Sequence, residues 1–273
     1  MSEGVPEKRE SVQSIDRAAE ILRCFDTGQV QLGISQVARK TGLSTSTVHR
    51  LLRALQDNGL VAQREDRRYV LGPLLVRLVR SGVASLSLRD AAVSSMTKLR
   101  DETDETVGLH ALLPTHERAV VDQVESRQPL RRTYTEFGMP IPLTLGAPGK
   151  AILAYLSASA QQNVLNRRIP QVTPSTPTDP AVLRRQLAEI RNSWFAVSYS
   201  ERTMGIRSIA AGIVDGLDRA VGAVSLSAPA LRMPPERMAK LGPRVAEAAW
   251  EASYAMGATK EGFERMLREA AWQ

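Results

Sequence analysis

A cluster of hydroxyl and cationic side chains between residues 44 and 53 has the composition of a surface that contacts phosphates and bases. The cluster comprises Ser44, Thr45, Ser46, Thr47, His49, Arg50 and Arg53. Hydroxyls and free backbone N–H groups at a helix start can bind phosphates, and an arginine one turn further along can donate two hydrogen bonds to a guanine. His49 could equally be an ordinary surface histidine. The major groove of DNA admits one helix, so the cluster predicts a DNA-reading helix.

Two short helices joined by a tight turn would position this cluster. On the second helix, an apolar stripe recurs every three or four residues on the opposite face and consists of Val48, Leu51, Leu52 and Leu55. Ser44 is suited to cap this helix, and Gly42 can adopt the left-handed conformation that ends the helix before it. Residues 34–57 therefore predict a helix-turn-helix.

A basic β-hairpin is predicted directly after the helix-turn-helix. Residues 60–64 and 68–71 alternate apolar and polar side chains across a turn at 65–67. The hairpin carries three cations that would reach flanking phosphates or the minor groove: Arg64, Arg67 and Arg68. An exposed turn that is merely basic is the alternative, and the acidic residues at 65 and 66 favour it. A helix-turn-helix with such a hairpin is a winged helix.

The charge distribution agrees with a nucleic-acid partner. The chain has 273 residues and a net charge of +7, and residues 34–80 hold nine Lys/Arg against three Asp/Glu, which gives +6. A solvated basic face would produce the same numbers. A winged helix that binds proteins, attached to a mere dimerisation module without ligand control, is therefore a rival interpretation, although the charge excess argues against it.

Catalytic and metal-binding signals are weak. Residues 146–151, GAPGKA, resemble a P-loop, but that motif needs four residues between its glycines and a Ser/Thr after the lysine, where this chain has Ala151. No nucleophile is spaced with a base, so we expect no enzyme activity. One cysteine and three scattered histidines predict no metal site and no cofactor. Without a signal peptide or an apolar run of membrane-spanning length, we expect a soluble cytoplasmic protein that does not bind membranes.

The chain divides into four predicted parts. Residues 10–72 form the winged helix, 73–90 a linker helix, 91–260 an α+β domain with a mainly antiparallel sheet, and 261–273 a short tail helix. The linker has an apolar stripe suited to pairing with a second copy: Leu74, Leu75, Leu78 and Val79. Strand patterns occur at 105–113, 118–126, 130–135, 195–200, 208–214 and 220–228. Helical patterns occur at 88–103, 147–156, after Asp179, and at 236–256 with an interruption near Pro243.

Several of these stretches in order resemble the IclR (isocitrate lyase regulator) family of bacterial transcription factors. The matching stretches are SVQSIDRAAEIL, GLSTSTVHRLLRAL, RYVLGPLL, VVDQVES, GKAILAYL, TPSTPTDPAVLRRQLAEIR and SLSAPALR. The resemblance covers about residues 11–257. It implies a winged helix, a linker helix and a GAF-like effector domain that binds a small organic acid. It also implies dimers that assemble into dimers of dimers on a pseudo-palindromic operator in double-stranded DNA.

The resemblance also implies a set of effector-contacting residues. Carried over position by position, the set is Leu130, Thr133, Ile141, Ala147, Pro148, Ser198, Ser208, Ser225 and Ser227. Residues 225 and 227 lie two apart on a predicted strand, so both hydroxyls face the same side, although buried serines can also simply satisfy backbone groups. The start of the 147–156 helix can receive a carboxylate. Arg207 could neutralise an acid or could be a surface arginine.

The chain departs from the family pattern at several positions. Leu143 to Pro148 replace the usual lead into the Gly-Lys-Ala helix, Trp194-Phe195-Ala196 replace a Gly-Tyr-Ala turn, and Ser200 stands where an acid is common. These three departures adjoin the expected pocket. Two others are Gly212, where proline is usual, and Asp104, where glycine is usual. The stretch GIRSIA at 205–210 resembles family members that answer to aromatic acids such as protocatechuate or 4-hydroxybenzoate.

Overall fold

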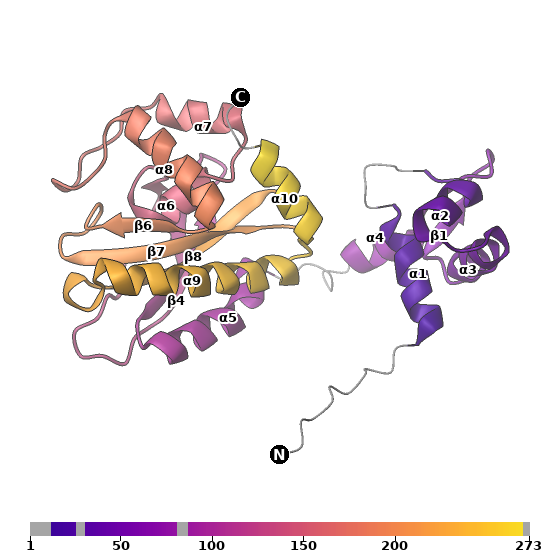
Figure 1. Ribbon diagram of the computed structural model, residues 1–273, viewed down its shortest axis with the longest axis horizontal. Coiled ribbons are helices and arrows are strands. Elements are labelled where there is room, and N and C mark those ends of the chain that lie inside the picture. The colour runs from indigo at the N-terminus through magenta and orange to yellow at the C-terminus, as the bar shows by residue number, and fades with distance from the viewer. Residues whose placement is uncertain (1–11, 26–30, 81–86, 270–273) are drawn as a thin grey trace, which may run out of the picture. The chain divides into compact units, whose positions relative to one another are not determined.

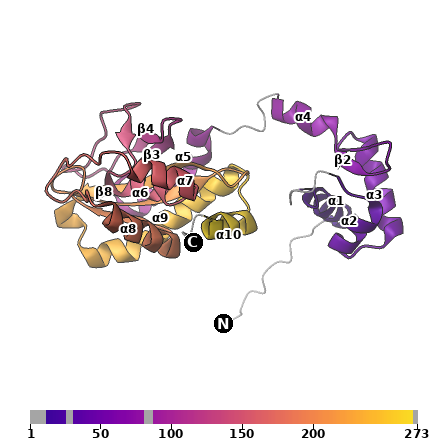
Figure 2. The ribbon, with the colours of Figure 1, turned by 90° about the horizontal axis from the view of Figure 1, so that it is seen from above.

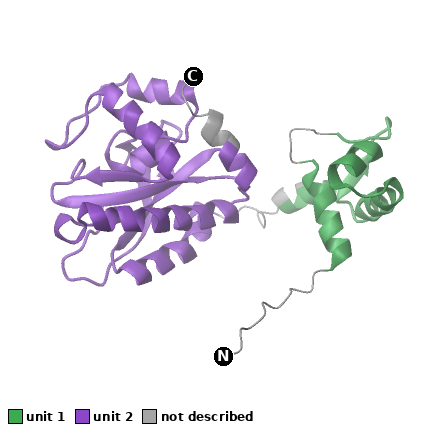
Figure 3. Ribbon diagram, viewed as in Figure 1, with its two compact units in different colours: residues 1–85 green, residues 86–273 purple. Residues whose placement is uncertain are grey.

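The computed structural model describes residues 12–25, 31–80 and 87–269. The chain forms two compact units, residues 1–85 and residues 86–273 (Figure 3). Each unit has its own hydrophobic core and is treated by itself below.

The first unit is a winged helix-turn-helix, as predicted. Its elements are α1 (Gln13–Arg23), α2 (Ile34–Thr41), α3 (Thr45–Asp57), β1 (Val61–Gln63), β2 (Tyr69–Leu71) and α4 (Pro73–Arg80). Gly42 adopts φ 69° and ends α2, and the Ser44 hydroxyl accepts the Thr47 N–H at 3.2 Å at the start of α3. Ile21 of α1, Val37 of α2 and Leu52 of α3 are fully buried together. This core fixes how α3 projects its other face.

A third chain segment pairs with the wing hairpin, and the sequence patterns did not indicate it. Leu32, which precedes α2, exchanges two backbone hydrogen bonds with Tyr69 of β2, at 3.0 and 2.8 Å. The two strands β1 and β2 pair antiparallel. The bridge ties the hairpin to the chain segment before α2, so the wing is anchored to the helical core.

Helix α4 begins against the turn between α3 and β1. The Leu74 N–H donates to the Gly59 carbonyl at 3.0 Å. Gly72 must be a glycine, because a Cβ there would lie 2.2 Å from that same carbonyl oxygen. Leu75 is half-buried, and Leu78 is 44% exposed. The pairing of this stripe with a second copy stays a prediction, and the Val79 side chain lies outside the described part of the chain.

The second unit is built on a six-stranded sheet with the order β5-β4-β3-β8-β7-β6. Every pair of neighbouring strands is antiparallel, which confirms the predicted α+β architecture. The elements are α5 (Leu88–Thr103), β3 (Thr106–Leu112), β4 (Glu117–Val124), β5 (Ile141–Pro142), α6 (Gly146–Leu153), α7 (Ala158–Leu165), α8 (Pro180–Ser193), β6 (Ala196–Tyr199), β7 (Ile206–Val214), β8 (Ala220–Pro229), the 3-10 helix η1 (Ala230–Arg232), α9 (Pro235–Ala255) and α10 (Lys260–Glu269).

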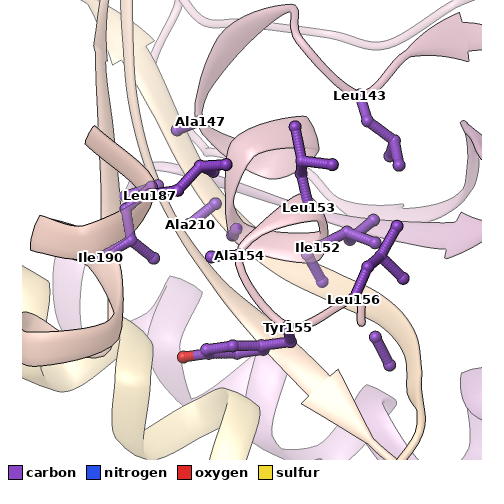
Figure 4. Close-up of a cluster of buried hydrophobic side chains, with 14 of the residues drawn as sticks. Leu143, Ala147, Ile152, Leu153, Ala154, Tyr155, Leu156, Leu187, Ile190 and Ala210 are labelled. Carbon is purple, nitrogen blue, oxygen red and sulfur yellow. The ribbon is translucent and has the colours of Figure 1, made fainter. Parts of the chain in front are cut away.

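Helices cover both faces of this sheet. Helices α5 and α9 lie below β6, β7 and β8 in Figure 1, and α6, α7 and α8 lie above these strands, a layer that Figure 2 views from above. Strand alternation divides the side chains between the faces. In β8, Val224 and Leu226 pack with the α5–α9 layer, whereas Ser225 faces the other way. Figure 4 shows the α6 core, with Leu187 and Ile190 of α8 on one side and Leu143 on the other.

One predicted strand and one predicted interruption of a helix were wrong. Residues 130–135 form no strand, because the Tyr134 backbone bonds to the Gln123 side chain instead of a neighbouring strand, at 2.8 and 3.1 Å. Helix α9 is continuous through Pro243. A proline inside a helix removes one backbone bond, but α9 is held along its length by side chains such as Val245 and Ala249 that are buried against the sheet.

Three of the departures from the family pattern, at Asp104, Trp194 and Gly212, have local structural reasons. Asp104 and Trp194 end α5 and α8 in the left-handed conformation, with φ 51° and 69°, which explains why glycine is usual there. The Trp194 ring packs on Phe263 of α10 with centroids 5.4 Å apart, and not in the expected pocket. A Cβ at Gly212 would lie 2.3 Å from the ring of Tyr155, which also packs on Phe263. The residues at 194 and 212 therefore accommodate α10.

Candidate functional site

The start of α3 presents the predicted polar cluster on the surface of the first unit. Val48, Leu52 and Leu55 are buried, so the opposite face of the helix is left to Thr45, Ser46, His49, Arg50 and Arg53, all exposed. Ser44 has a different role. Its hydroxyl accepts the Thr47 N–H and lies 2.8 Å from the Thr47 hydroxyl, so both side chains serve the helix cap first.

The three predicted arginines of the wing are all exposed, but they differ in whether an acidic side chain is nearby. The Asp66 carboxylate lies 3.8 Å from Arg68 Nε and accepts the Arg68 N–H at 3.1 Å, which partly offsets that charge. Within the described ranges, Arg64 and Arg67 form no salt bridge. Arg67 has φ 63° at the tip of the turn, which the bond from the Arg64 N–H to the Arg68 carbonyl closes at 2.8 Å. Arg64 and Arg67 are therefore the more available cations.

A row of hydroxyls crosses the upper face of the sheet in the second unit. Ser198 of β6 stands opposite Ser208 of β7, Ser208 opposite Ser227 of β8, and Ser227 opposite Thr106 of β3. Directly paired residues have Cβ atoms about 4.5–5.5 Å apart, so four hydroxyls line up across four strands. Two of the predicted serine positions, 198 and 208, are thus adjacent in space although ten residues apart in the sequence.

A pocket lies over this row, and the empty volume of about 350 Å³ at this place includes space that is open to solvent. Its lining residues are Arg118, Arg132, Tyr134, Gly146, Pro148, Ser198, Arg202, Thr203, Ile206, Ser208 and Ser227. The predicted positions that line it are Pro148, Ser198, Ser208 and Ser227. Ser225 is fully buried one step deeper, where its hydroxyl contacts His110 and Tyr134.

The structure places the other predicted effector contacts elsewhere. Ala147 belongs to the core beneath α6, and Ile141 packs in a small cluster with Val120, Tyr134 and Leu145. Leu130 is 66% exposed, and Thr133 does not line the pocket although the next residue does. Arg207 lies on the opposite face of β7 from Ser208, donates to the Met233 carbonyl at 2.9 Å and stacks over Tyr199. Strand alternation separates the two neighbours.

A buried hydrogen-bonded chain leads from Arg118 to the pocket floor. Arg118 Nη1 lies 2.9 Å from His110 Nδ1. A guanidinium only donates, so Nδ1 accepts and the His110 proton is on Nε2. That proton points at Ser225 Oγ, 2.9 Å away. Ser225 lies 3.2 Å from the Tyr134 hydroxyl, which lies 2.9 Å from Ser227 Oγ. Either hydroxyl can donate in these last two contacts, and the Gly108 carbonyl lies 3.5 Å from Ser225 Oγ as a further acceptor, so Ser227 can donate or accept at the pocket.

Gly108 of β3 makes room for this chain. It stands opposite Ser225 in the sheet, and a Cβ there would lie 2.7 Å from the Tyr134 ring. The ring can therefore lie flat over the strand and reach both serines. The Thr106 hydroxyl donates to the Arg132 carbonyl at 2.5 Å, which holds the same segment over the sheet.

Three arginines surround the pocket. Arg118 is fully buried and bonds only to neutral acceptors, His110 and the Leu145 carbonyl, and its Nε has no acceptor among the described residues. Burial, together with the charges of Arg202 and Arg132, lowers the pKa of Arg118 to about 9. Burial and the Arg118 charge likewise hold the pKa of His110 well below its usual value, so His110 is neutral.

The other two arginines sit nearer the rim. The Arg132 guanidinium lies 4.8 Å from the centroid of the Tyr134 ring, a cation–π contact. Arg202 binds Glu136 at 2.6 Å, and this ion pair links the 200–205 loop to the segment before β5. The pocket wall therefore has strong positive potential and donors on several sides.

The start of α6 already holds a carboxylate from the protein. Glu201 bonds to Lys150 of α6 at 2.6 Å, and the Gly146 backbone N–H and the Ser198 hydroxyl also favour its charged form. Burial nevertheless raises the pKa of Glu201 and lowers that of Lys150. An effector carboxylate at this helix start, as predicted, would therefore compete with the Glu201 carboxylate for the same donors.

Sequence patterns missed the three arginines that give the pocket its charge and two residues of the buried hydrogen-bonded chain. The arginines are Arg118, Arg132 and Arg202, and the other two residues are His110 and Tyr134. The sequence could have indicated two of them as site residues, because His110 and Arg118 are polar residues at otherwise apolar strand positions. They are diagonal neighbours, since His110 pairs with Val120, two residues beyond Arg118. The other three lie in irregular segments without periodicity.

No group of His, Cys, Asp and Glu in the described ranges is arranged to hold a metal ion. No helix there is both long and apolar enough to cross a membrane.

Comparison with known proteins supplies the remaining evidence. Residues 14–65 match the model of the IclR helix-turn-helix domain, and residues 81–254 match that of the bacterial transcriptional regulator IclR C-terminal domain. The HTH-type transcriptional regulator Rv1719 of Mycobacterium tuberculosis is 38% identical over 81% of this chain and 84% of its own. The transcriptional repressor IclR of Escherichia coli is 30% identical over 90% of each chain. The crystal structure of an IclR transcriptional regulator from Silicibacter sp. TM1040 is 29% identical with a TM-score of 0.79, over 90% of this chain and 96% of that one.

Proposed function

We propose that the two units of this chain, which belongs to the IclR family of bacterial transcriptional regulators, have separate functions. Family membership makes it a DNA-binding regulator with an effector-binding C-terminal domain, and not an enzyme. The effector is proposed to be a small organic acid that occupies the pocket above the serine row. The observation that carries this proposal is the convergence of Arg118, Arg132 and Arg202 on one pocket in that domain.

The start of α3 is proposed to read bases in the major groove. Thr45, Ser46, His49 and Arg50 are exposed there, and Ser44 and Thr47 frame the exposed N–H groups of the first turn. Arg53 lies one turn further along and, with the wing arginines at 64, 67 and 68, would contact phosphates. Direct readout by arginine and phosphate contact by the wing are separable, because only the first depends on sequence.

Two copies are proposed to read a pseudo-palindrome. The apolar side of α4 would pair the copies, and dimers would associate further into dimers of dimers. In this scheme residues 10–72 read DNA, 73–90 link, 91–260 bind effector and 261–273 form a tail helix. Effector binding would change the spacing of the reading helices, a coupling of about 1–3 kcal/mol. Half-sites one helical turn apart, or a multiple, are expected.

The effector range is proposed to include aromatic acids. Tyr134, Pro148 and Ile206 give the pocket apolar walls, and Ser227 offers a hydroxyl on the floor. A flat ring could lie between these walls while its carboxylate meets the arginines. Bidentate contact with a guanidinium is the favoured geometry for such a group.

The test uses the full chain and duplexes selected from a random pool by binding. Affinity is measured by fluorescence anisotropy over a range of salt concentrations, with and without simple organic acids that include 4-hydroxybenzoate and protocatechuate. We expect log affinity to fall steeply with log salt and at least one acid to change operator affinity at fixed salt. A flat salt dependence would instead favour the protein-interaction module. Failure of every acid to change affinity would refute the effector assignment.

A further inference from the structure

The charges around the pocket do not balance. Arg118, Arg132 and Arg202 line it, and the one carboxylate from the described residues that is bonded to any of them is Glu136, on Arg202. The neighbouring Glu201 is neutralised by Lys150 at 2.6 Å. Among the residues that the structure describes, the wall therefore has two arginines without an acidic partner, Arg118 and Arg132.

The uncompensated positive charge is most unfavourable at Arg118, because this arginine is the most deeply buried of the three. Arg118 is 1% exposed, and its bonds go to a neutral imidazole and a backbone carbonyl. Buried charges in proteins are usually paired, since water no longer solvates them. The Arg118 Nε lacks an acceptor within the described ranges, although neighbouring polar atoms on the sheet are bonded. An anion in the pocket would supply the missing counter-charge.

We infer that the effector of this pocket is a small organic dianion, whose two negative groups compensate the charges of Arg118 and Arg132. This inference rests on the proposed function of the pocket as the effector site. A dicarboxylate and a phosphate monoester share the required charge. The carbon skeleton would lie against Tyr134, Pro148 and Ile206, and the hydroxyls of Ser208 and Ser227 would bond to the anionic oxygens.

A monoanion would leave one of these charges uncompensated. Each hydrogen-bonded charge pair contributes enough that its loss corresponds to about tenfold to a few hundredfold in affinity. Because an amide has nearly the size and shape of a carboxylate but no charge, the monoamide of a dicarboxylic acid isolates the second charge. The dianion preference is therefore measurable with ligand pairs that differ in little else.

The test measures binding of such pairs to the full-length protein by titration calorimetry. The dicarboxylates are succinate, glutarate, phthalate, isophthalate and terephthalate, each with its monoamide, and phenyl phosphate, a dianion, is paired with its monoanionic methyl ester. We expect the tightest member to be a dianion that binds at least about tenfold better than its monoanionic partner. Tight binding of phenyl phosphate with weak binding of the dicarboxylates would identify the phosphate source, and the converse would identify the dicarboxylate source.

Variants separate the pocket charge from general basicity. Arg132→Gln removes one lining cation, whereas Arg131→Gln, its matched control, removes a neighbour that is paired with Glu125 outside the pocket. We expect Arg132→Gln alone to abolish the dianion preference. As a probe that needs no knowledge of the effector, sulfate at matched ionic strength with chloride should raise the melting temperature more in wild type than in Arg132→Gln.

The outcomes distinguish this inference from the proposed function. Monoamides that bind as tightly as their parents and still alter operator affinity would overturn the dianion inference and leave the effector site in place. Equal sulfate protection of wild type and Arg132→Gln, with no acid bound by either protein, would overturn both. A dianion preference that survives Arg132→Gln but disappears in Arg131→Gln would place the charge selectivity outside this pocket and refute the inference.

Discussion

Replacing Lys150 by methionine should destabilise the second unit strongly, because it leaves the Glu201 carboxylate buried without its cation. The side chains of Lys150 and Glu201 are 2% and 7% exposed, and Nζ lies 2.6 Å from Oε1. Removing one partner of such a buried pair typically costs about 3–5 kcal/mol, since the remaining charge is uncompensated. Lys150 also donates to the Gln186 side chain at 3.0 Å, which adds a smaller loss.

The same reasoning predicts strong coupling between the two positions. Glu201→Gln leaves Lys150 buried with only neutral acceptors and should also be destabilising. The double variant removes both charges, so its cost should fall below the sum of the single costs by about 1–3 kcal/mol. Lys98 is the matched control, because its bond to Glu251 has a similar length, 3.0 Å, but lies on the surface with side chains 52% and 42% exposed. Lys98→Met should cost less than about 1 kcal/mol.

The assay is urea unfolding followed by tryptophan fluorescence. All three tryptophans lie in residues 86–273, and Trp194 and Trp250 both pack on Phe263, so the signal reports on the second unit. A cost of 3–5 kcal/mol also corresponds to a fall in melting temperature of roughly 6–20 °C for a unit of this size. Additive costs in the double variant, or a Lys150→Met cost as small as that of Lys98→Met, would refute the account of a coupled buried pair.

Four further predictions address the reading surface and the pocket. Arg50→Ala should weaken operator binding by about 1–3 kcal/mol if Arg50 contacts a base, whereas Gln56→Ala, at an exposed position near the other end of α3, should not; an unchanged operator affinity would exclude Arg50. Arg67→Asn retains a residue type that tolerates φ 63° and should lower the salt slope by about one contact if the wing touches phosphate. Below pH 6.5, the usual pKa of histidine, the unfolded chain binds a proton at position 110 that the buried, neutral His110 of the folded chain does not bind. As the pH falls, the wild type should therefore lose stability relative to His110→Gln by about 1.4 kcal/mol per pH unit. Parallel curves of unfolding free energy against pH for the two proteins would contradict this. Ser227→Ala should weaken effector binding about tenfold in calorimetry and leave operator affinity intact.

Much of the fold was predictable from short stretches of sequence. The cap at Ser44, the turn at Gly42 and the stripe at Val48 and Leu52 depend on neighbours within a few residues, and local periodicity predicts them. The Asp179 cap was predicted in the same way, and its carboxylate accepts the Ala181 N–H at 2.7 Å. The failures occurred where side chains replaced backbone partners, as in residues 130–135, or where packing overrode a local rule, as at Pro243.

The pocket was only partly predictable. Strand alternation predicted that Ser225 and Ser227 share one face, and the resemblance added Ser208 to the predicted contacts. The structure shows that Ser208 and Ser227 line the pocket while Ser225 lies beneath. The left-handed turns at Asp104 and Trp194 explain two departures from the family pattern without any reference to effector choice. Conversely, Arg207 was separated from its neighbour Ser208 by strand alternation, so sequence adjacency was misleading there.

The sequence by itself determined the two units, the reading helix and the strands that form the pocket floor, because each depends on periodic patterns within about twenty residues. The tertiary structure alone decided the charge of the pocket. Arg118 comes from a strand, Arg132 from an irregular segment and Arg202 from a loop, and they meet because the β3–β8 pairing joins residues more than a hundred positions apart. Electrostatic interaction depends on distance and burial in the folded chain, and neither quantity is encoded in local periodicity.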